Sequence, residues 1–328
     1  MKVTWIRLPT RRYGGAIYGE KVRRILSEYY NFETKNIESG YLGWKYLKPL
    51  EWFFGLLKIK GNSDLWIRDD FYSIALQLLS RTKGKNLAVI YHIDSSVFPL
   101  FLRPLLFLLE KLFYFSLRKA DAILTISQYW QNYFLSRGYK NVYKISPSFD
   151  LFDFNISYEE VSEFKKKYQL EGKPIVYIGN CQKAKGVVEA YQALKDLDLH
   201  LVTSGEKQIE IPVLNLNLSY RDYLKLLKIS TIVITMSLFK EGWCMTAQEA
   251  MLLKTPVIGS GRGGMGELLE GGKQIICQDF GNLRERVEYL LNHPEEREKM
   301  GEDGYSFAKN FTLERFKNDW LDLINKLI

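Results

Sequence analysis

Hydrophobic positions in the first half of the chain form short apolar runs that alternate with longer stretches of helical periodicity. Short apolar runs bounded by turn residues are typical of buried parallel strands, and the periodic stretches of amphipathic helices. Strands are expected at 2–8, 64–67, 87–92, 122–126 and 142–145, and helices at 19–30, 72–80, 105–119 and 127–137. This alternation predicts a parallel α/β sheet.

The second half shows the same alternation after a charged helix expected at 158–168. Strands are expected at 174–178, 200–203, 229–236 and 256–259, and helices at 187–197, 247–254, 283–291, 294–310 and 313–328. The pattern is interrupted at Ser146-Pro-Ser-Phe-Asp150, where we expect the hinge to start. We therefore predict two Rossmann-like domains, at 1–150 and 151–310, followed by a terminal helix at 311–328.

Composition places the chain among globular proteins of a reducing compartment. Its 328 residues are 46% hydrophobic, which suffices for two domain cores. The three cysteines and three histidines are scattered, so we expect neither disulfides nor a metal site. The N-terminal apolar run breaks at Arg7, unlike a signal peptide, and prolines and charges interrupt the most apolar segment, 97–117. These features predict a cytoplasmic protein that does not cross a membrane.

Positive charge is concentrated in the first half. Residues 1–150 contain 23 Lys and Arg against 12 Asp and Glu, whereas the whole chain has a net charge of +8. Two segments there, 44–60 and 101–119, mix aromatic and basic residues as interfacial segments do. We expect this half to contact an anionic membrane, on its inner face. The alternative for 101–119 is a helix packed on the sheet. Nucleic acid is not expected, because no recognised binding motif accompanies the charge.

Candidate chemistry is concentrated in the segment Ser237–Val257, where two carboxylates flank the expected start of a helix. Glu241 follows a buried strand and Glu249 lies inside the helix. Backbone N–H groups at a helix start attract phosphate, and carboxylates accept hydrogen bonds from sugar hydroxyls, so a nucleotide sugar would explain both. On the pair alone, a helix-capping Glu241 and a solvated Glu249 are an equally good interpretation.

The segment from Glu241 to Ile258 resembles the E-x7-E segment of retaining nucleotide-sugar glycosyltransferases of family 4. Further similarities follow in the family's order at Gly14-Gly15, His92, 120–127, 177–179, Lys185-Gly186 and Gly263-Gly264 with Glu267. The resemblance implies the GT-B fold, an α/β architecture of two Rossmann-like parallel-sheet domains facing across a cleft. It also implies that the first domain is the acceptor side, the second binds the nucleotide sugar, and the last helix crosses back to the first.

The resemblance implies a role for each matched residue. Glu249 would hold the ribose hydroxyls, Glu241 the sugar hydroxyls, and His92 the sugar as charge develops on it. Lys185 would neutralise the diphosphate. The other implied donor-binding residues are Gly179, Asn180, Gly242, Trp243, Cys244, Met245 and Thr246, and Gly14 and Gly15 would form the acceptor and phosphate loop. Taken singly, the glycine pair is equally well interpreted as a tight turn, whereas a lone histidine is more often structural and a single lysine is more often a solvated surface charge.

Two positions depart from the family pattern. Asn180 stands where the family often has an arginine, which leaves Lys183, Arg11 or Arg12 as substitutes, and Cys244 stands where the family usually has a glycine.

Two further motifs suggest other chemistry. Residues 261–266 satisfy G-x-G-x-x-G, the pattern of a dinucleotide site, but the next strand is expected too soon for a full βαβ crossover. We interpret these glycines as a loop over the donor. Asp196-Leu-Asp198 has the form of a metal-binding Asp-x-Asp, yet it joins a helix to a strand with no acidic partner nearby, so we interpret it as a connection.

The sequence therefore predicts a metal-independent retaining hexosyltransferase that needs no cofactor. Its donor would be a nucleoside diphosphate sugar and its acceptor a glycan or lipid-linked glycan. Three alternatives remain: a GT-B-like sugar-nucleotide epimerase, a non-catalytic membrane- or nucleic-acid-binding protein, and, on the glycine match alone, a nicotinamide enzyme.

Overall fold

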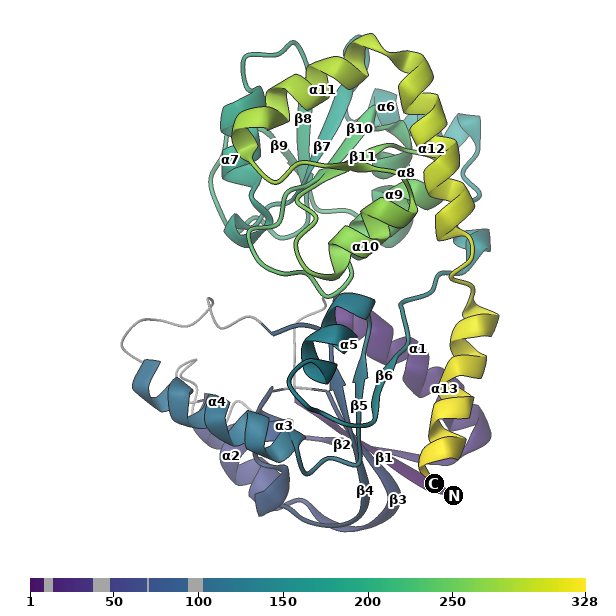
Figure 1. The fold of residues 1–328 in the computed structure, drawn as a ribbon. Coiled ribbons are helices and arrows are strands. Elements are labelled where there is room, and N and C mark those ends of the chain that lie inside the picture. Colours follow the sequence, from purple (N-terminus) through teal and green to yellow (C-terminus); the bar gives the residue numbers. More distant parts are fainter. Residues whose placement is uncertain (9–13, 38–47, 70, 94–102) are drawn as a thin grey trace. The chain divides into compact units, whose positions relative to one another are not determined.

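The chain forms two compact units, each a parallel sheet between layers of helices (Figure 1). This computed structural model describes residues 1–8, 14–37, 48–69, 71–93 and 103–328. The first unit contains Met1–Ser146 and Glu314–Ile328, and the second contains Pro147–Leu313. The predicted fold class, α/β with two Rossmann-like domains, is confirmed.

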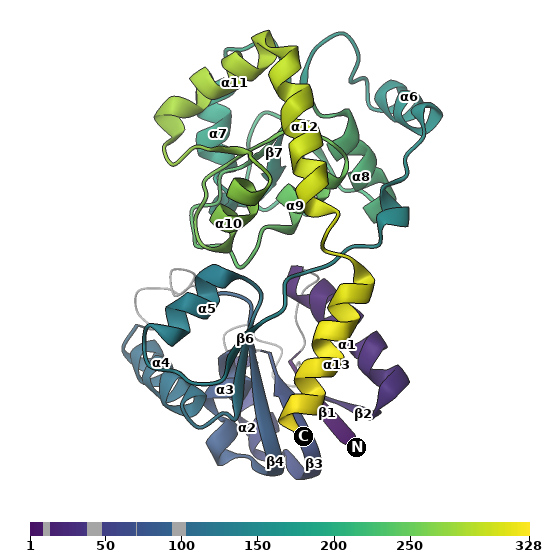
Figure 2. The ribbon, with the colours of Figure 1, turned by 45° about the vertical axis from the view of Figure 1, so that its right-hand side comes forward.

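Unit 1 is built on a sheet of strand order β2-β1-β3-β4-β5-β6, in which every pair is parallel. Its strands are β1 (Lys2–Arg7), β2 (Asn31–Asn36), β3 (Lys60–Arg68), β4 (Arg81–Ile90), β5 (Ala122–Thr125) and β6 (Val142–Lys144). Its helices are α1 (Gly14–Tyr29), α2 (Lys48–Leu57), α3 (Phe71–Ala75), η1 (Gln77–Leu79), α4 (Arg103–Leu117), α5 (Gln128–Leu135) and α13 (Leu313–Leu327). Figures 1 and 2 show α1 and α13 on one side of this sheet and α2, α3 and α4 on the other.

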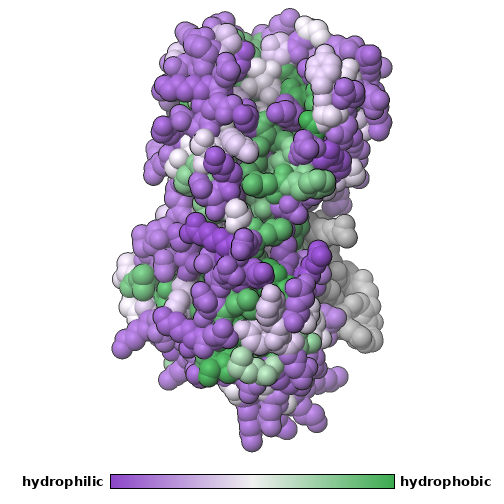
Figure 3. Space-filling view, turned by 90° about the vertical axis from the view of Figure 1, so that its right-hand side faces the viewer, coloured by the Kyte–Doolittle hydropathy of each residue, from purple (hydrophilic) through white to green (hydrophobic). Residues whose placement is uncertain are grey.

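The C-terminal helix α13 packs on unit 1 through one apolar stripe. Phe316, Trp320 and Ile324 are spaced four residues apart and are buried. The Trp320 indole donates a hydrogen bond of 3.2 Å to the Tyr18 hydroxyl, which in turn donates to the Ile145 carbonyl. Figure 3 shows the side of the molecule that bears α12 and α13, and most of the side chains exposed there are hydrophilic, as expected when the apolar stripe faces inward.

Unit 2 has the strand order β12-β11-β10-β7-β8-β9, again with every pair parallel. Its strands are β7 (Ile175–Asn180), β8 (His200–Ser204), β9 (Leu214–Leu216), β10 (Ile232–Thr235), β11 (Val257–Gly259) and β12 (Ile275–Ile276). Its helices are η3 (Leu151–Phe154), α6 (Tyr158–Lys167), η4 (Lys183–Lys185), α7 (Val187–Leu194), α8 (Tyr220–Ile229), α9 (Met245–Leu252), α10 (Gly264–Gly271), η5 (Phe280–Asn282), α11 (Leu283–Asn292) and α12 (Pro294–Ala308).

Alternation along β7 shows how both faces of the unit 2 sheet are covered. Val176 and Ile178 pack with α7 and α11 residues such as Ala190 and Val287 in one core cluster. Tyr177, between them, points to the opposite face, where its ring lies 6.1 Å from that of Tyr223 on α8. A strand covered on both faces consists of apolar residues throughout, which is the pattern that made β7 predictable.

Several elements and boundaries differ from the sequence-based expectations; among the boundaries, β3 begins at Lys60 rather than 64, β4 begins at Arg81 rather than 87, and α3 ends at Ala75 rather than 80. Helices α2 and α8 and strands β2 and β9 were not predicted; β2 and β9 are edge strands with polar or half-exposed residues, so they lack an apolar run. Ile229 ends α8 rather than starting the strand, which begins at Ile232. Gly14 and Gly15 begin α1 rather than lying in a loop before it, and His92 lies two residues beyond the end of β4.

Candidate functional site

The topology of unit 2 marks where a ligand is expected. If the six strands are numbered 1 to 6 in chain order, their order across the sheet is 3-2-1-4-5-6. The order of the strands therefore reverses between the neighbours β7 and β10, although these two strands are parallel. Open α/β sheets bind ligands at the carboxyl ends of the strands at such a reversal. Lys185 follows β7 and Glu241 follows β10. Both predicted residues therefore lie at the switch point.

An ion pair joins these two residues. Lys185 Nζ lies 2.6 Å from Glu241 Oε1, and Ser237 donates a hydrogen bond of 2.5 Å to the same oxygen. The Glu241 side chain is 10% exposed and that of Lys185 28%, so the pair is only partly screened by water. Burial lowers the pKa of Lys185, but the charge and hydrogen bond of Glu241, together with Cys244, raise it, and the net shift is upward. Lys185 is therefore a permanent cation beside the carboxylate.

The glycine-rich loop before α10 fixes the backbone of Glu241. The Glu241 N–H donates to the Arg262 carbonyl at 3.1 Å, and the Gly264 N–H donates to the Glu241 carbonyl at 2.9 Å. Gly263 has a φ of +71°, and a Cβ there would lie 2.4 Å from the Glu241 carbonyl oxygen. The loop therefore supports the backbone of Glu241, and its position over a donor stays a prediction.

The start of α9 presents backbone donors next to this pair. The Cys244 carbonyl accepts from the N–H groups of Ala247 and Gln248, whereas those of Met245 and Thr246 have no acceptor within the described part of the chain. Cys244 adopts a left-handed conformation with φ 76°. Burial raises the pKa of its thiol to about 12, so the thiol itself adds no negative charge there. This helix start can therefore accept a phosphate group.

Glu249 lies one helical turn further along α9 and is held by two tyrosines. Tyr220 donates to its Oε1 at 3.1 Å and Tyr223 to its Oε2 at 3.2 Å. The carboxylate is almost fully buried and faces α8, so the alternative of a solvated helix residue is wrong. The two tyrosines are site residues that the sequence did not reveal, because α8 itself was not predicted; the capping residue Ser219 followed by Leu224 and Leu227 was the signal for it.

Asn180, the last residue of β7, is oriented by its neighbours. Its Oδ1 accepts hydrogen bonds from Tyr177 at 2.9 Å and from Ser204 at 3.1 Å. Gly179 precedes it with a φ of +105°, which favours glycine. Because the oxygen is occupied, the amide nitrogen is the atom that Asn180 can offer to a ligand where the family often has an arginine.

The remaining predicted residues have varied positions. Gly242 is buried, and the Trp243 indole donates to Gln248 at 2.6 Å and packs on Phe311, so this side chain braces the loop before α9. Lys183 is exposed in η4. Gly14, Gly15 and His92 belong to unit 1, and Arg11 and Arg12 lie outside the described residues.

The described residues contain neither a cluster of metal ligands nor a membrane-spanning helix. None of the groups of His, Cys, Asp and Glu in these ranges has the clustering that a metal ion needs. Among the described helices, none has both the length and the apolar character of a membrane span.

The family model that matches this sequence covers residues of the second unit. The sequence model for the family of group 1 glycosyl transferases matches residues 159–307. An uncharacterized glycosyltransferase of Methanocaldococcus jannaschii is 31% identical over 157 residues, which are 43% of this chain and 44% of that protein. Spore coat protein SA of Bacillus subtilis is 29% identical over 50% of this chain and 52% of its own length. The matches thus span about half the length of these curated relatives.

Comparisons of structure cover the whole chain. The Anabaena HepE protein, solved in complex with UDP-glucose, has a TM-score of 0.75 at 15% identity over 100% of both chains. The sucrose-phosphate synthase of Thermosynechococcus elongatus has a TM-score of 0.80 at 17% identity, covering 99% of this chain and 98% of that one. The chain has the GT-B fold. Lys185, Asn180, Glu241 and Glu249 all lie in the segment that the family model matches.

The candidate site in unit 2 therefore combines three kinds of group at one sheet edge: a cation, backbone donors and two carboxylates. Lys185 of η4 provides the cation, and the start of α9 provides two backbone N–H groups that have no acceptor within the described residues. Glu241, in the loop between β10 and α9, provides one carboxylate, and Glu249 provides the second one turn along α9. Such a set can bind an anion flanked on two sides by hydroxyl groups.

Proposed function

We propose that the protein is a retaining glycosyltransferase that transfers a hexose from a nucleoside diphosphate sugar to an acceptor. The observation that carries the proposal is the convergence of Lys185, the start of α9, Glu241 and Glu249 at the switch point of unit 2. A diphosphate fits the cation and the backbone donors. Each carboxylate then has hydroxyls to accept from, those of the hexose for Glu241 and those of the ribose for Glu249.

The roles follow from where charge changes during transfer. The bond between the anomeric carbon and the donor phosphate oxygen breaks, and a bond from the acceptor oxygen to that carbon forms on the same face. Negative charge grows on the leaving diphosphate, where Lys185 and the N–H groups of Met245 and Thr246 stabilise it. Positive charge grows on the sugar ring. The leaving phosphate oxygen takes the proton of the acceptor, so no protein base and no metal is required.

The ion pair between Lys185 and Glu241 is compatible with donor binding at this site. Each residue satisfies the other's charge until a diphosphate and a sugar replace the contact. A thermal-shift panel with UDP, GDP, ADP and their sugars tests binding, because a ligand of the native state raises the melting temperature. We expect one nucleotide and its sugar to stabilise the wild type and the control variant Lys195→Ala, an exposed lysine at the end of α7, alike, and Lys185→Ala far less. No stabilisation by any member of the panel would contradict the proposal.

We further propose that the acceptor is a lipid-linked glycan and that unit 1 docks on an anionic membrane. On α4, Phe107 and Phe115 are 58% and 53% exposed, and Lys111 lies between them in the same stripe. The ammonium groups of Lys111 and Lys119 lie 4.4 Å and 5.9 Å from the centres of the two phenyl rings. Exposed aromatics that alternate with cations are typical of surfaces that lie at the lipid headgroups.

The neighbouring helix extends this surface. Phe54 on α2 is 58% exposed, while Trp52, Phe53 and Leu56 of α2 pack with Leu112 of α4 in one cluster. Phe113 and Leu117 bury the opposite face of α4 against the sheet, so the helix is both packed and left with an aromatic outer face. Both expectations for segment 101–119, a packed helix and an interfacial one, are compatible with this arrangement.

A further inference from the structure

Two phenols from one helix turn hold the Glu249 carboxylate. Tyr220 and Tyr223 are three residues apart on α8, so they project from the same face. Each donates to a different oxygen of Glu249, at 3.1 Å and 3.2 Å. Hydrogen bonds from two phenols to different oxygens fix the plane of the carboxylate.

The hydrogen bonds also define a direction. Tyr223 has one hydroxyl hydrogen, and its oxygen lies 3.0 Å from Thr246 Oγ1 as well as 3.2 Å from Glu249. The charged carboxylate is the stronger acceptor, so the single hydrogen of Tyr223 favours Glu249 over the Thr246 hydroxyl. Burial, and then the charge of Glu249, raise the pKa of both tyrosines, which therefore remain protonated donors. Tyr223 links the phosphate side of α9 to the carboxylate.

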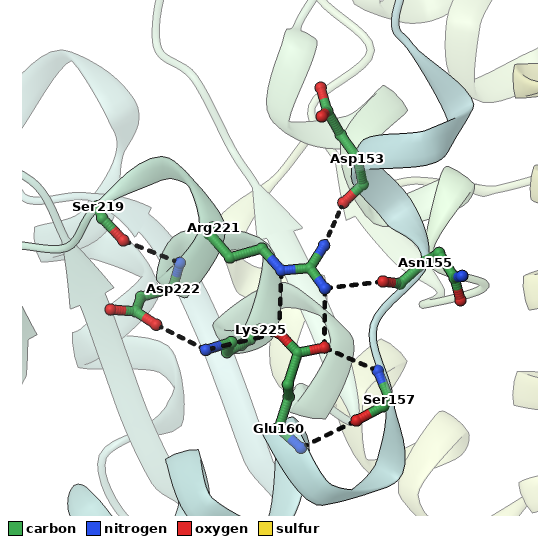
Figure 4. A network of polar contacts seen from close by, with 8 residues as sticks. All are labelled: Asp153, Asn155, Ser157, Glu160, Ser219, Arg221, Asp222 and Lys225. Carbon is green, nitrogen blue, oxygen red and sulfur yellow. Dashed lines mark hydrogen bonds and ion pairs between the residues drawn. The ribbon is translucent and has the colours of Figure 1, made fainter.

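A second network fixes the turn that carries these tyrosines (Figure 4). Arg221, between them in sequence, makes a two-pronged contact with Glu160 of α6, from Nε to Oε1 at 3.0 Å and from Nη2 to Oε2 at 2.7 Å. It also donates to the carbonyls of Asp153 and Asn155. Glu160 closes a capping box with Ser157. The planar guanidinium thus ties the start of α8 to two other elements.

We propose that Tyr220 and Tyr223 are positioning residues that set the Glu249 carboxylate to accept the ribose hydroxyls of the donor. The inference rests on the proposed function. It adds that the fixed carboxylate makes the site prefer ribonucleotides to deoxyribonucleotides. Tyr220 is 44% exposed at the rim of this group, whereas Glu249 is only 4% exposed. Without the phenols the carboxylate can turn to other rotamers, and its contribution to recognising the 2′-hydroxyl is lost while the diphosphate contacts remain.

The test compares the binding of ribonucleotides with that of their 2′-deoxy counterparts by titration calorimetry. The probes are UDP, GDP and ADP, each against its 2′-deoxy form. We expect the wild type to prefer one ribonucleotide by about tenfold or more, as loss of a hydrogen bond to a charged group implies. In the double variant Tyr220→Phe with Tyr223→Phe the preference should fall below about threefold. Glu249→Gln should lower it similarly.

The matched control is Tyr289→Phe on α11, a tyrosine with the same exposed fraction of 44%. It should leave the preference unchanged, and circular dichroism should show that the double variant is folded, because the rings are retained. A double variant that discriminates as well as the wild type overturns the positioning role alone. A wild type that binds none of the six nucleotides overturns the proposed function and this inference with it.

Discussion

At the scale of single residues, the site depends on which groups burial keeps neutral and which it keeps charged. Lys185 stays a cation because Glu241 compensates its burial, whereas the thiol of Cys244 stays neutral because burial raises its pKa to about 12. Lys185, Glu241 and Glu249 could be proposed as site residues from the sequence, because each matches a motif of the family that the chain resembles. It did not reveal that Lys185 and Glu241 contact each other, since residues 56 positions apart meet only through the order of the strands.

The buried thiol gives a direct prediction for a residue. All three cysteines are buried, and burial raises the pKa of Cys244 and Cys277, so the folded protein should react hardly at all with a thiol-specific disulfide reagent at pH 8. In guanidinium chloride all three thiols should react. Rapid labelling of Cys244 in the folded protein, identified by peptide mapping, would show that its thiolate is accessible.

At the scale of elements, helices and strands with a strong apolar pattern were predictable, and those that depend on neighbours were not. The buried strand β10 and the helix α9 were predicted close to their actual bounds. Edge strand β2 was missed because its residues, Asn31 to Asn36, are polar or half-exposed and gain their structure only by pairing with β1. Missing α8 hid the tyrosines that hold Glu249.

The loop before α10 carries the prediction for an element. Gly263→Ala should lower transfer about a hundredfold or more by displacing Glu241, because its Cβ would lie 2.4 Å from the Glu241 carbonyl oxygen. Gly172→Ala is the matched control: Gly172 also has a positive φ, of +81°, but its Cβ would meet nothing within 4 Å. The control should lose only stability, about 1 kcal/mol. Equal activities of the two variants would exclude this role for Gly263.

At the scale of the whole molecule, buried phenols determine how stability changes with pH. Burial raises the pKa of Tyr18 and Tyr177 well above 10, and both side chains are at most 2% exposed. Their contribution is complete below the pKa of the unfolded chain, near 10, and is lost as pH rises toward the folded value. Each should lower the free energy of unfolding by about 1.4 kcal/mol per pH unit above 10. Denaturant titrations between pH 8 and 11 measure the slope. Tyr177→Phe should reduce it and Tyr289→Phe should not; an unchanged slope in Tyr177→Phe would contradict this assignment.

The proposed membrane surface extends beyond a single element, because it combines the exposed aromatic residues of α2 and α4 with the basic charge of unit 1. Phe107→Ser with Phe115→Ser should weaken binding to phosphatidylglycerol vesicles about tenfold or more without lowering the melting temperature. Phe152→Ser in unit 2, where the side chain is 80% exposed, is the control and should bind as the wild type does. Added salt should weaken wild-type binding, and equal binding of all three proteins in sedimentation would reject the surface.

The most direct measurement of the central claim follows the anomeric proton of the donor by nuclear magnetic resonance, using the nucleotide sugar that the thermal-shift panel identifies and a lipid-linked acceptor. The wild type should convert the donor to a product of the same anomeric configuration. Glu241→Ala should fold normally and be slower by about a hundredfold or more. An inverted product, an intact donor, or full turnover by Glu241→Ala would contradict retaining transfer at the switch point of unit 2.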